Sequence, residues 1–443
     1  MTTEILRFAL VWGTSLVSSV GSALTSFVLG VWVYQTTGSV TGFALVMLAA
    51  MLPPVLLGPL AGVVADRFDR RKVLVAADCA GGTVTAVLAV LVHTGNLHPV
   101  HVCVAAAVGA AAGTFHFTAY QAITPLLVPA RHLGRANGLM QLGMAAQIAA
   151  PAVAAALLAA VGTGGVILLD LASFAVAVGT LLAVRLPEHV LRPERPAAPP
   201  PLRADLVQGW RYLRERRPLL LLALVFTGYN FVYGLAGVLV QPLILAFAPP
   251  ATLGVLMLAG GCGVLAGSLA MGAWGGPRRR MNGITLFMLA GAAALVLHAP
   301  SPSPLLVGAA AAVFLFTLPI VQGCGRTLFQ TKVEPAALGR VTGTVQALGQ
   351  AAQPLAYLAA GPLSEQVAEP LLAPGGALAG SVGVLTGTGD GRGIAALFLL
   401  AAVLLAALAA TTLTPSLRTL ERTLPDTLPD IPPTRHPEVD HAR

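Results

Sequence analysis

The chain has 443 residues, of which 56% are hydrophobic and 10% charged, with a net charge of +8 and a mean hydropathy of +0.81. Soluble domains carry about 25% charged residues, so this chain has too little polar surface for a particle that faces water on all sides. The composition excludes a soluble enzyme, a nucleic-acid-binding protein and a secreted disulfide scaffold. It indicates a polytopic membrane protein.

Twelve apolar stretches are long enough to cross a bilayer, because a helix crosses ~30 Å of hydrocarbon with about 20 residues. In chain order they fall at 8–34, 41–65, 73–94, 99–121, 137–161, 164–185, 218–246, 251–274, 282–299, 304–324, 341–363 and 393–413. The expected fold class is therefore all-α, with twelve transmembrane helices.

Lysine and arginine are concentrated in the loops on one side of this arrangement. Of the 26 in the chain, only Arg392 falls in a loop on the other side. Cytoplasmic loops retain basic residues. We therefore expect a multi-pass protein of the cytoplasmic (inner) membrane with both termini in the cytoplasm.

The chain also resembles itself at a distance of about half its length. The segments that match are 70–72 with 278–280 and 128–141 with 333–346. This order indicates two six-helix bundles, the parallel repeat found in one large class of transporters. The predicted parts are a first bundle at 1–185, a cytoplasmic linker with an amphipathic helix at 186–217, a second bundle at 218–413 and a disordered cytoplasmic tail at 414–443.

The loop that begins at Gly62 reads Gly-Val-Val-Ala-Asp-Arg-Phe-Asp-Arg-Arg-Lys. It resembles the G-x-x-x-D-R-x-G-R-R-K signature of the major facilitator superfamily, with Asp69 in place of the central glycine. Three further segments, 32–39, 168–174 and 205–214, are similar to the bacterial branch of macrolide-efflux proteins and siderophore (enterobactin) exporters. The resemblance implies two six-helix bundles and transport by alternating access.

In that superfamily the loop latches the two halves together on the cytoplasmic side. The resemblance implies this role for Gly62, Asp66, Arg67, Arg70 and Arg71. Independently, a glycine lets membrane helices approach closely, and arginines bind carboxylates or lipid phosphates. The alternative is that these basic residues serve only to orient the chain in the membrane.

The fifth span contains Pro151, the proline of a family signature of exporters whose glycines are alanines here. The resemblance implies an export-type kink at this position. The alternative is a proline kink packed among small side chains.

No G-x-x-x-x-G-K-[ST] loop occurs in the sequence, so we expect a transporter driven by an ion gradient rather than an ATP-hydrolysing enzyme. Ionisable residues inside spans are costly and usually functional. Asp170, His116 and Asp78 are therefore the candidates for proton coupling. The alternatives are a structural hydrogen bond for Asp170, simple packing for His116 and, for Asp78, an ion pair with the arginine loop, which is the loop that begins at Gly62.

Uncharged polar residues follow one face of the first, seventh and eleventh spans, and we expect them to line the substrate cavity. They are Ser15, Ser18, Ser22, Ser26, Tyr229, Asn230, Tyr233, Gln346, Gln350 and Gln353. Such a cavity suits a bulky amphipathic molecule better than a sugar phosphate or a dicarboxylate. The alternative for the serines is close helix packing.

The sequence thus predicts a secondary active transporter that exports a hydrophobic or amphipathic small molecule, such as a drug, an antibiotic or a siderophore-like compound, by proton antiport. An importer of a small metabolite, a lipid flippase and a non-transporting membrane scaffold are the alternatives. The expected partners are the substrate, protons and membrane lipids. We expect a monomer with no cofactor, no metal and no nucleic-acid partner.

Overall fold

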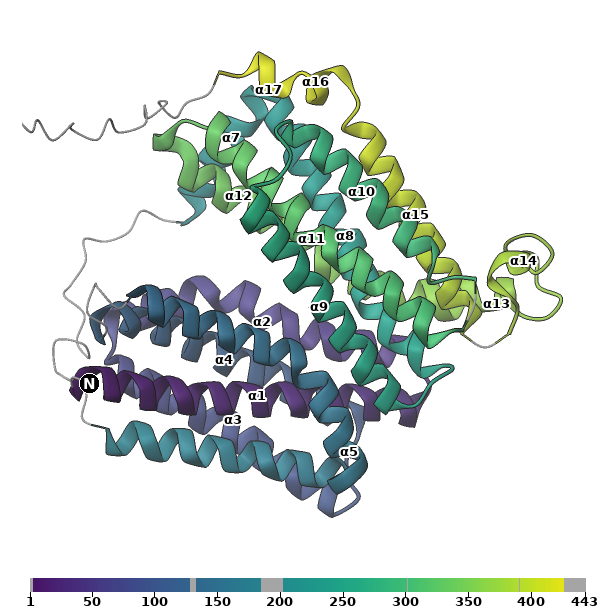
Figure 1. Ribbon diagram of the computed structural model, residues 1–443. Coiled ribbons are helices and arrows are strands. Elements are labelled where there is room, and N and C mark those ends of the chain that lie inside the picture. The colour runs from purple at the N-terminus through teal and green to yellow at the C-terminus, as the bar shows by residue number, and fades with distance from the viewer. Residues whose placement is uncertain (1–2, 128–132, 185–201, 301, 390, 426–443) are drawn as a thin grey trace, which may run out of the picture.

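The computed structural model describes residues 3–127, 133–184, 202–300, 302–389 and 391–425, and the secondary structure in these ranges is helical throughout. Figure 1 shows two helical bundles. The first contains α1 (Thr3–Thr37), α2 (Val40–Arg67), α3 (Arg70–His93), α4 (Pro99–Leu127) and α5 (Leu133–Ala183). The second contains α8 (Arg217–Leu245), α9 (Pro250–Trp274), α10 (Arg280–Val296), α11 (Pro304–Lys332), α12 (Pro335–Pro362) and α15 (Arg392–Thr411). We call these bundles the N-half and the C-half.

Each predicted span falls on one of these helices, several of which extend beyond it by up to eight residues, and two of the spans share α5. The break between those two lies at Gly162, whose φ of 69° turns the chain inside what is otherwise one continuous helix. In the described ranges nine helices are long and apolar enough to cross a membrane, and α10 is shorter. The all-α class is confirmed, and the count of twelve crossings stays a prediction.

Shorter elements lie at the ends of the bundles. The linker helix α7 (Leu202–Glu215) packs against α12, where Arg216 lies over the ring of Tyr212 and pairs with Glu334 at 2.8 Å. Between α12 and α15 the chain forms a π-helix, η2 (Leu363–Ala368), and then α13 (Glu369–Leu372) and α14 (Val382–Thr386).

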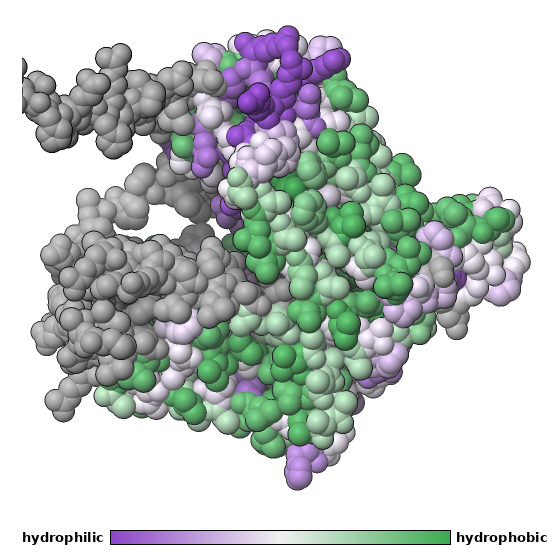
Figure 2. All heavy atoms as spheres, viewed as in Figure 1, coloured by the Kyte–Doolittle hydropathy of each residue, from purple (hydrophilic) through white to green (hydrophobic). Residues whose placement is uncertain are grey.

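The surface of the C-half is apolar over the middle of its helices. Figure 2 shows this apolar face, with polar residues gathered beyond one end of it, around α16 and α17. Large apolar side chains stand exposed there, such as Leu269, Leu286 and Val403 on α9, α10 and α15. An exposed apolar band is what lipid tails require, and the chain is a multi-pass membrane protein.

The two halves touch at one side of the molecule and separate toward the other. We call the side where α1 begins and α2 turns into α3 the terminal side, and the opposite one the far side. Helix α2 packs against α12, and α5 packs against α9. Figure 1 shows the bundles in contact through these helices on the far side and diverging toward the terminal side.

The predicted disordered tail begins too early. Residues Pro415–Arg418 form α16 and Leu420–Thr423 form α17, and the side chains of Leu417 and Leu420 are buried. The Nζ of Lys332 donates to the carbonyl oxygens of Glu421 and Leu424, both at 2.7 Å. These contacts offset the entropy of ordering the segment, so the prediction is wrong for this stretch, whereas 426–443 lie outside the described residues.

Glycines set the spacing between α9 and α11. A Cβ added at Gly267 would overlap the carbonyl oxygen of Phe316, and one at Gly263 would overlap that of Ala312. Small residues let membrane helices approach to this distance. A Cβ at Gly272 on the same helix would meet no atom of the described chain within 4 Å.

Gly267→Val is expected to destabilise the C-half, because overpacking of this kind costs about 2 kcal/mol and the obstacle here is backbone that cannot rotate away. Gly272→Val on the same helix is the matched control and should leave stability unchanged. Thermal unfolding of the detergent-solubilised protein, followed by size-exclusion chromatography, measures both. Equal midpoints for the two variants would show that α9 and α11 are not packed this closely.

Candidate functional site

A cavity of about 460 Å³ lies inside the N-half, within the size range of small-molecule sites. Helices α1 to α5 all contribute to its walls. Most of the lining is small or apolar, and among the residues that the structure describes no lysine or arginine lines it. Its polar groups are hydroxyls, one amide, two carboxylates and one imidazole.

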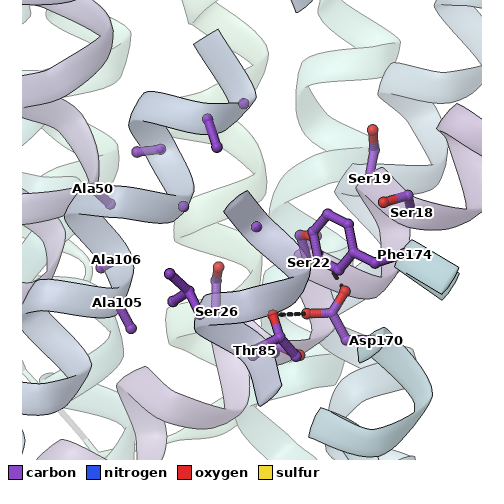
Figure 3. Close-up of a pocket in the computed structure, with 18 of the residues that line it drawn as sticks. Ser18, Ser19, Ser22, Ser26, Ala50, Thr85, Ala105, Ala106, Asp170 and Phe174 are labelled. Atoms are coloured by element: carbon purple, nitrogen blue, oxygen red, sulfur yellow. Dashed lines mark hydrogen bonds between the residues drawn. The ribbon is translucent and has the colours of Figure 1, made fainter. Parts of the chain in front are cut away.

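The serines of α1 form one wall of this cavity. Ser15, Ser18, Ser22 and Ser26 line it, as does Ser19. Their spacing of three and four residues places them on one helix face, and Figure 3 shows the side chains of this face beside Asp170 and Phe174. We call this row of serines on α1 the serine stripe. The serine stripe lines a cavity and is not wholly enclosed in a contact between helices.

Asp170 of α5 is the most enclosed acidic group at the site, with 2% of its surface exposed. Its Oδ1 accepts a hydrogen bond from the Ser22 hydroxyl at 3.3 Å, and its Oδ2 accepts one from the Thr85 hydroxyl of α3 at 3.4 Å. Figure 3 draws both bonds. The carboxylate thus connects α1, α3 and α5 at a single point.

Gly21 makes this arrangement possible. A Cβ at this position would lie 2.7 Å from Oδ1 of Asp170 and 2.8 Å from the hydroxyl of Ser173. The absence of a side chain lets α1 approach α5 closely enough for Ser22 to reach the carboxylate. Sequence reasoning missed Gly21 and Thr85, although Gly21 shares the helix face of the serines, which is a signal that could have identified it.

Asp78 of α3 pairs with His116 of α4, with 2.8 Å between Oδ1 of the aspartate and Nδ1 of the imidazole. Among the described residues the ionisable partner of Asp78 is His116 and not an arginine of the loop, so that alternative is wrong. The other oxygen, Oδ2, is buried and accepts no hydrogen bond from any residue that the structure describes. Both residues line the same cavity as Asp170.

The three candidates for proton coupling are thus brought together in one cavity, which their positions in the sequence could not show. Phe174 adds an aromatic wall that the sequence reasoning missed, and its ring packs against Gly81, where a Cβ would lie 2.7 Å from the ring. The cavity can therefore offer an aromatic face, several hydroxyls and an uncommitted carboxylate oxygen to a bound molecule.

The predicted cavity residues of the C-half lie elsewhere. Tyr229 is buried in the core of the C-half, with 1% of its surface exposed, and is not on the cavity wall as predicted. Asn230 donates to the carbonyl oxygen of Phe226 at 2.8 Å, back within its own helix. Tyr233 stacks on Phe314 and lines a separate, smaller cavity of about 120 Å³.

The glutamines of α12 are also apart from the cavity of the N-half. Gln346 and Gln350 are exposed, and Gln353 packs against Gly234 of α8. Among the described residues, none of these three glutamines lines the cavity that the serines of α1 line.

The family model described as Major Facilitator Superfamily matches residues 11–357. The chain belongs to the Major Facilitator Superfamily. It is a transporter rather than an enzyme, and the resemblance read from the loop at Gly62 is confirmed.

Efflux proteins are among the relatives of this superfamily member. Macrolide efflux protein A of Streptococcus pyogenes is 28% identical over 351 residues, which cover 77% of this chain and 86% of the relative. Macrolide efflux protein A of Enterococcus faecalis is 29% identical and covers 68% of this chain and 95% of its own length. The multidrug efflux pump Tap of Mycobacterium bovis is 28% identical over a match that covers 75% of this chain and 81% of the pump.

Solved transporters share the fold. The nucleoside transporter NupG superposes with a TM-score of 0.68 at 13% identity, covering 94% of this chain and 99% of that one. A bacterial homologue of the human lysosomal transporter Spinster, in an inward-facing and unoccupied conformation, gives a TM-score of 0.64 at 14% identity and covers 93% and 98%.

The superfamily signature loop makes its described contacts within the N-half. Arg71 donates to the carbonyl oxygen of Leu182 at 2.5 Å, and Nε of Arg70 donates to that of Ala65 at 3.4 Å. The Asp69 that replaces the family glycine caps α3, because its Oδ1 accepts from the backbone N–H of Arg71 at 2.9 Å. An aspartate is a favoured residue at that position.

Gly62 and Asp66 of the predicted latch make no described contact with the C-half. A Cβ at Gly62 would meet no described atom within 4 Å, so the expected close helix approach at this glycine is not made by any helix that the structure describes there. The side chain of Asp66 lies outside the described residues. The latch role of the loop, Arg67 included, therefore stays a prediction.

Pro151 lies where the two halves meet. A Cβ at Gly254 of α9 would lie 2.9 Å from the carbonyl oxygen of Pro151 and 2.6 Å from the Cβ of Ala155. The proline segment of α5 therefore packs directly on the C-half. A change in helix shape at Pro151 would alter the contact between the halves. The export-type role of the kink stays a prediction.

Proposed function

We propose that this transporter exports a hydrophobic or amphipathic small molecule from the cytoplasm in exchange for protons. The relatives with efflux names support the direction of transport. The cavity of the N-half supports the substrate class, since the described part of its lining consists of hydroxyls, small apolar groups and Phe174 and includes no arginine or lysine. A phosphorylated or dicarboxylate substrate would require such cations.

The observation that carries the proposal is that the serine stripe, Asp170 and the pair Asp78–His116 line one cavity. A buried carboxylate is unfavourable in a membrane interior unless it is protonated or hydrogen-bonded. A proton and a substrate with hydrogen-bond donors can therefore each satisfy the same acidic groups. Arrival of one favours release of the other, which is what antiport requires.

The proposed orientation places the terminal side in the cytoplasm, together with both termini and the linker 186–217. Its basis is the concentration of arginine and lysine in the loops of that side. The N-half, at 1–185, and the C-half, at 218–413, then act as the two moving bodies. In this orientation the present arrangement is open toward the cytoplasm and closed toward the outside.

Proteoliposomes test the proposal directly. Purified protein is reconstituted into liposomes, a pH gradient is imposed across their membrane, and uptake of a radiolabelled macrolide is measured. Protein-free liposomes are the control. We expect uptake that depends on the gradient and stops when a protonophore dissipates it. Uptake that ignores the gradient overturns proton antiport, and movement of a fluorescent phospholipid in place of the macrolide favours a flippase.

A further inference from the structure

A hydrogen-bonded carboxylate joins the two halves on the far side. Oε1 of Glu365, in η2 of the C-half, accepts from the Ser39 hydroxyl at 2.8 Å and from the backbone N–H of Thr41 at 2.9 Å. Its Oε2 accepts from the Thr41 hydroxyl at 2.6 Å. Ser39 is the N-cap of α2 in the N-half and also accepts from the N–H of Gly42. A single side chain thus makes three hydrogen bonds across the boundary between the halves.

The local structure aims Glu365 at this position. Gly361, four residues earlier and on the same helix face, packs so tightly that a Cβ there would lie 2.6 Å from the Cα of Thr41. Directly after it the chain changes from α-helix to the π-helix η2. Segments of π-helix are rare in proteins, and those that occur often lie at functional sites. The close approach at Gly361 brings the carboxylate to the first turn of α2.

The electrostatics favour the charged form of this carboxylate. Burial alone would raise the pKa of Glu365, but the hydrogen bonds from Thr41 and Ser39 outweigh burial and hold that pKa below its usual range. The start of a helix also carries partial positive charge, which stabilises an anion. Glu365 is therefore ionised near neutral pH, and its bonds to α2 are of the stronger, charge-assisted kind.

The other boundary between the halves has a different character. Where α5 meets α9 the packing is apolar and close, and a Cβ at Gly254 would lie within 3.0 Å of atoms of Pro151, Ala152 and Ala155. In the two-fold repeat, the pair α5–α9 corresponds to α12–α2. Both boundaries are close-packed at a glycine, and α12–α2 adds the anion of Glu365.

We propose that Glu365 is the far-side gate residue, which holds α2 and α12 together in the present state and must leave Ser39 and Thr41 each time the far side opens. The inference rests on the alternating-access part of the proposed function and is independent of substrate and coupling ion. Removing the carboxylate removes bonds made in only one of two states, so it shifts the equilibrium between them. The far-side-open population increases as a result.

Distances between spin labels test this without substrate or pH gradient. In a background without the four native cysteines, one pair of labels at Asn96 and Val384 reports on the far side, and a second pair at Lys72 and Arg278 reports on the terminal side; all four positions are exposed. Glu365→Ala is expected to increase the ratio of far-side-open to far-side-closed molecules by about tenfold or more, because charged hydrogen bonds are lost. The terminal-side pair should shorten in the same sample.

Gln366→Ala, at an exposed position of the same π-helix, is the matched control and should leave both distance distributions unchanged. Thr41→Val, which removes one of the three donors, should give a smaller shift in the same direction and serves where Glu365→Ala fails to fold. Unchanged distributions in folded Glu365→Ala and Thr41→Val overturn the proposal. This outcome would leave gradient-driven export untouched, so failure of the gate and failure of the proposed function are distinguishable.

Discussion

Asp170→Asn is expected to abolish export driven by a pH gradient while substrate binding persists. Asparagine keeps the shape of the side chain and can still accept from Ser22 or Thr85, the two hydroxyls that bond to Asp170. It cannot take up and release a proton, so the cycle loses its coupling. Proteoliposomes should show exchange of labelled for unlabelled macrolide without a gradient, and no accumulation when a gradient is imposed.

Thr85→Val is the matched control for this experiment. It removes one hydrogen bond to the carboxylate and leaves the ionisable group in place, so gradient-driven transport should be weakened and not lost. If Asp170→Asn still accumulates substrate against the gradient, the coupling role passes to the pair Asp78–His116 in the same cavity. Asp78→Asn, measured in the same assay, would then be the variant that loses accumulation.

Ser22→Trp is expected to reduce transport to the level of protein-free liposomes. Ser22 is partly buried, lines the cavity and lies beside Asp170, so an indole at this position fills space that the substrate requires. Because the cavity has a volume of about 460 Å³, one large side chain removes a substantial part of it. Substrate binding by the purified protein, measured by isothermal titration, should be lost together with transport.

Two variants separate steric block from other effects. Ser22→Ala removes the hydroxyl without adding bulk and should retain binding. Val87→Trp places the same indole at an exposed position on α3, two residues after Thr85 and away from the cavity wall, and should transport normally. Normal binding by Ser22→Trp would mean that the substrate site is not the cavity of the N-half.

The polarity of individual helix faces was predictable from local sequence. The serine spacing on α1 placed four hydroxyls on one face, and the structure has them on a cavity. The signature at Gly62 identified the superfamily, and the apolar stretches located the helices. Each of these features depends on residues within a few turns of one another: periodicity gives the serine face, apolar length gives the spans, and the signature is a resemblance carried by one short loop.

The partners of the buried groups were decided by tertiary structure. Asp78 meets His116, although the arginine loop is closer to it in sequence. Glu365 contacts Ser39 and Thr41 across the two halves, and Lys332 binds carbonyl oxygens of the tail that was predicted to be disordered. Pairings of this kind depend on how each helix is rotated and how closely its neighbour approaches.

By itself, therefore, the sequence determined the class of protein, the position of its helices and the polar faces they carry, because hydropathy and periodicity are properties of local segments. Only the tertiary structure decided which acidic groups share one cavity and where the halves touch. Those outcomes depend on close approaches at Gly21, Gly254 and Gly361, each set by atoms of a helix distant in the chain. A glycine in a sequence does not show which neighbour it admits.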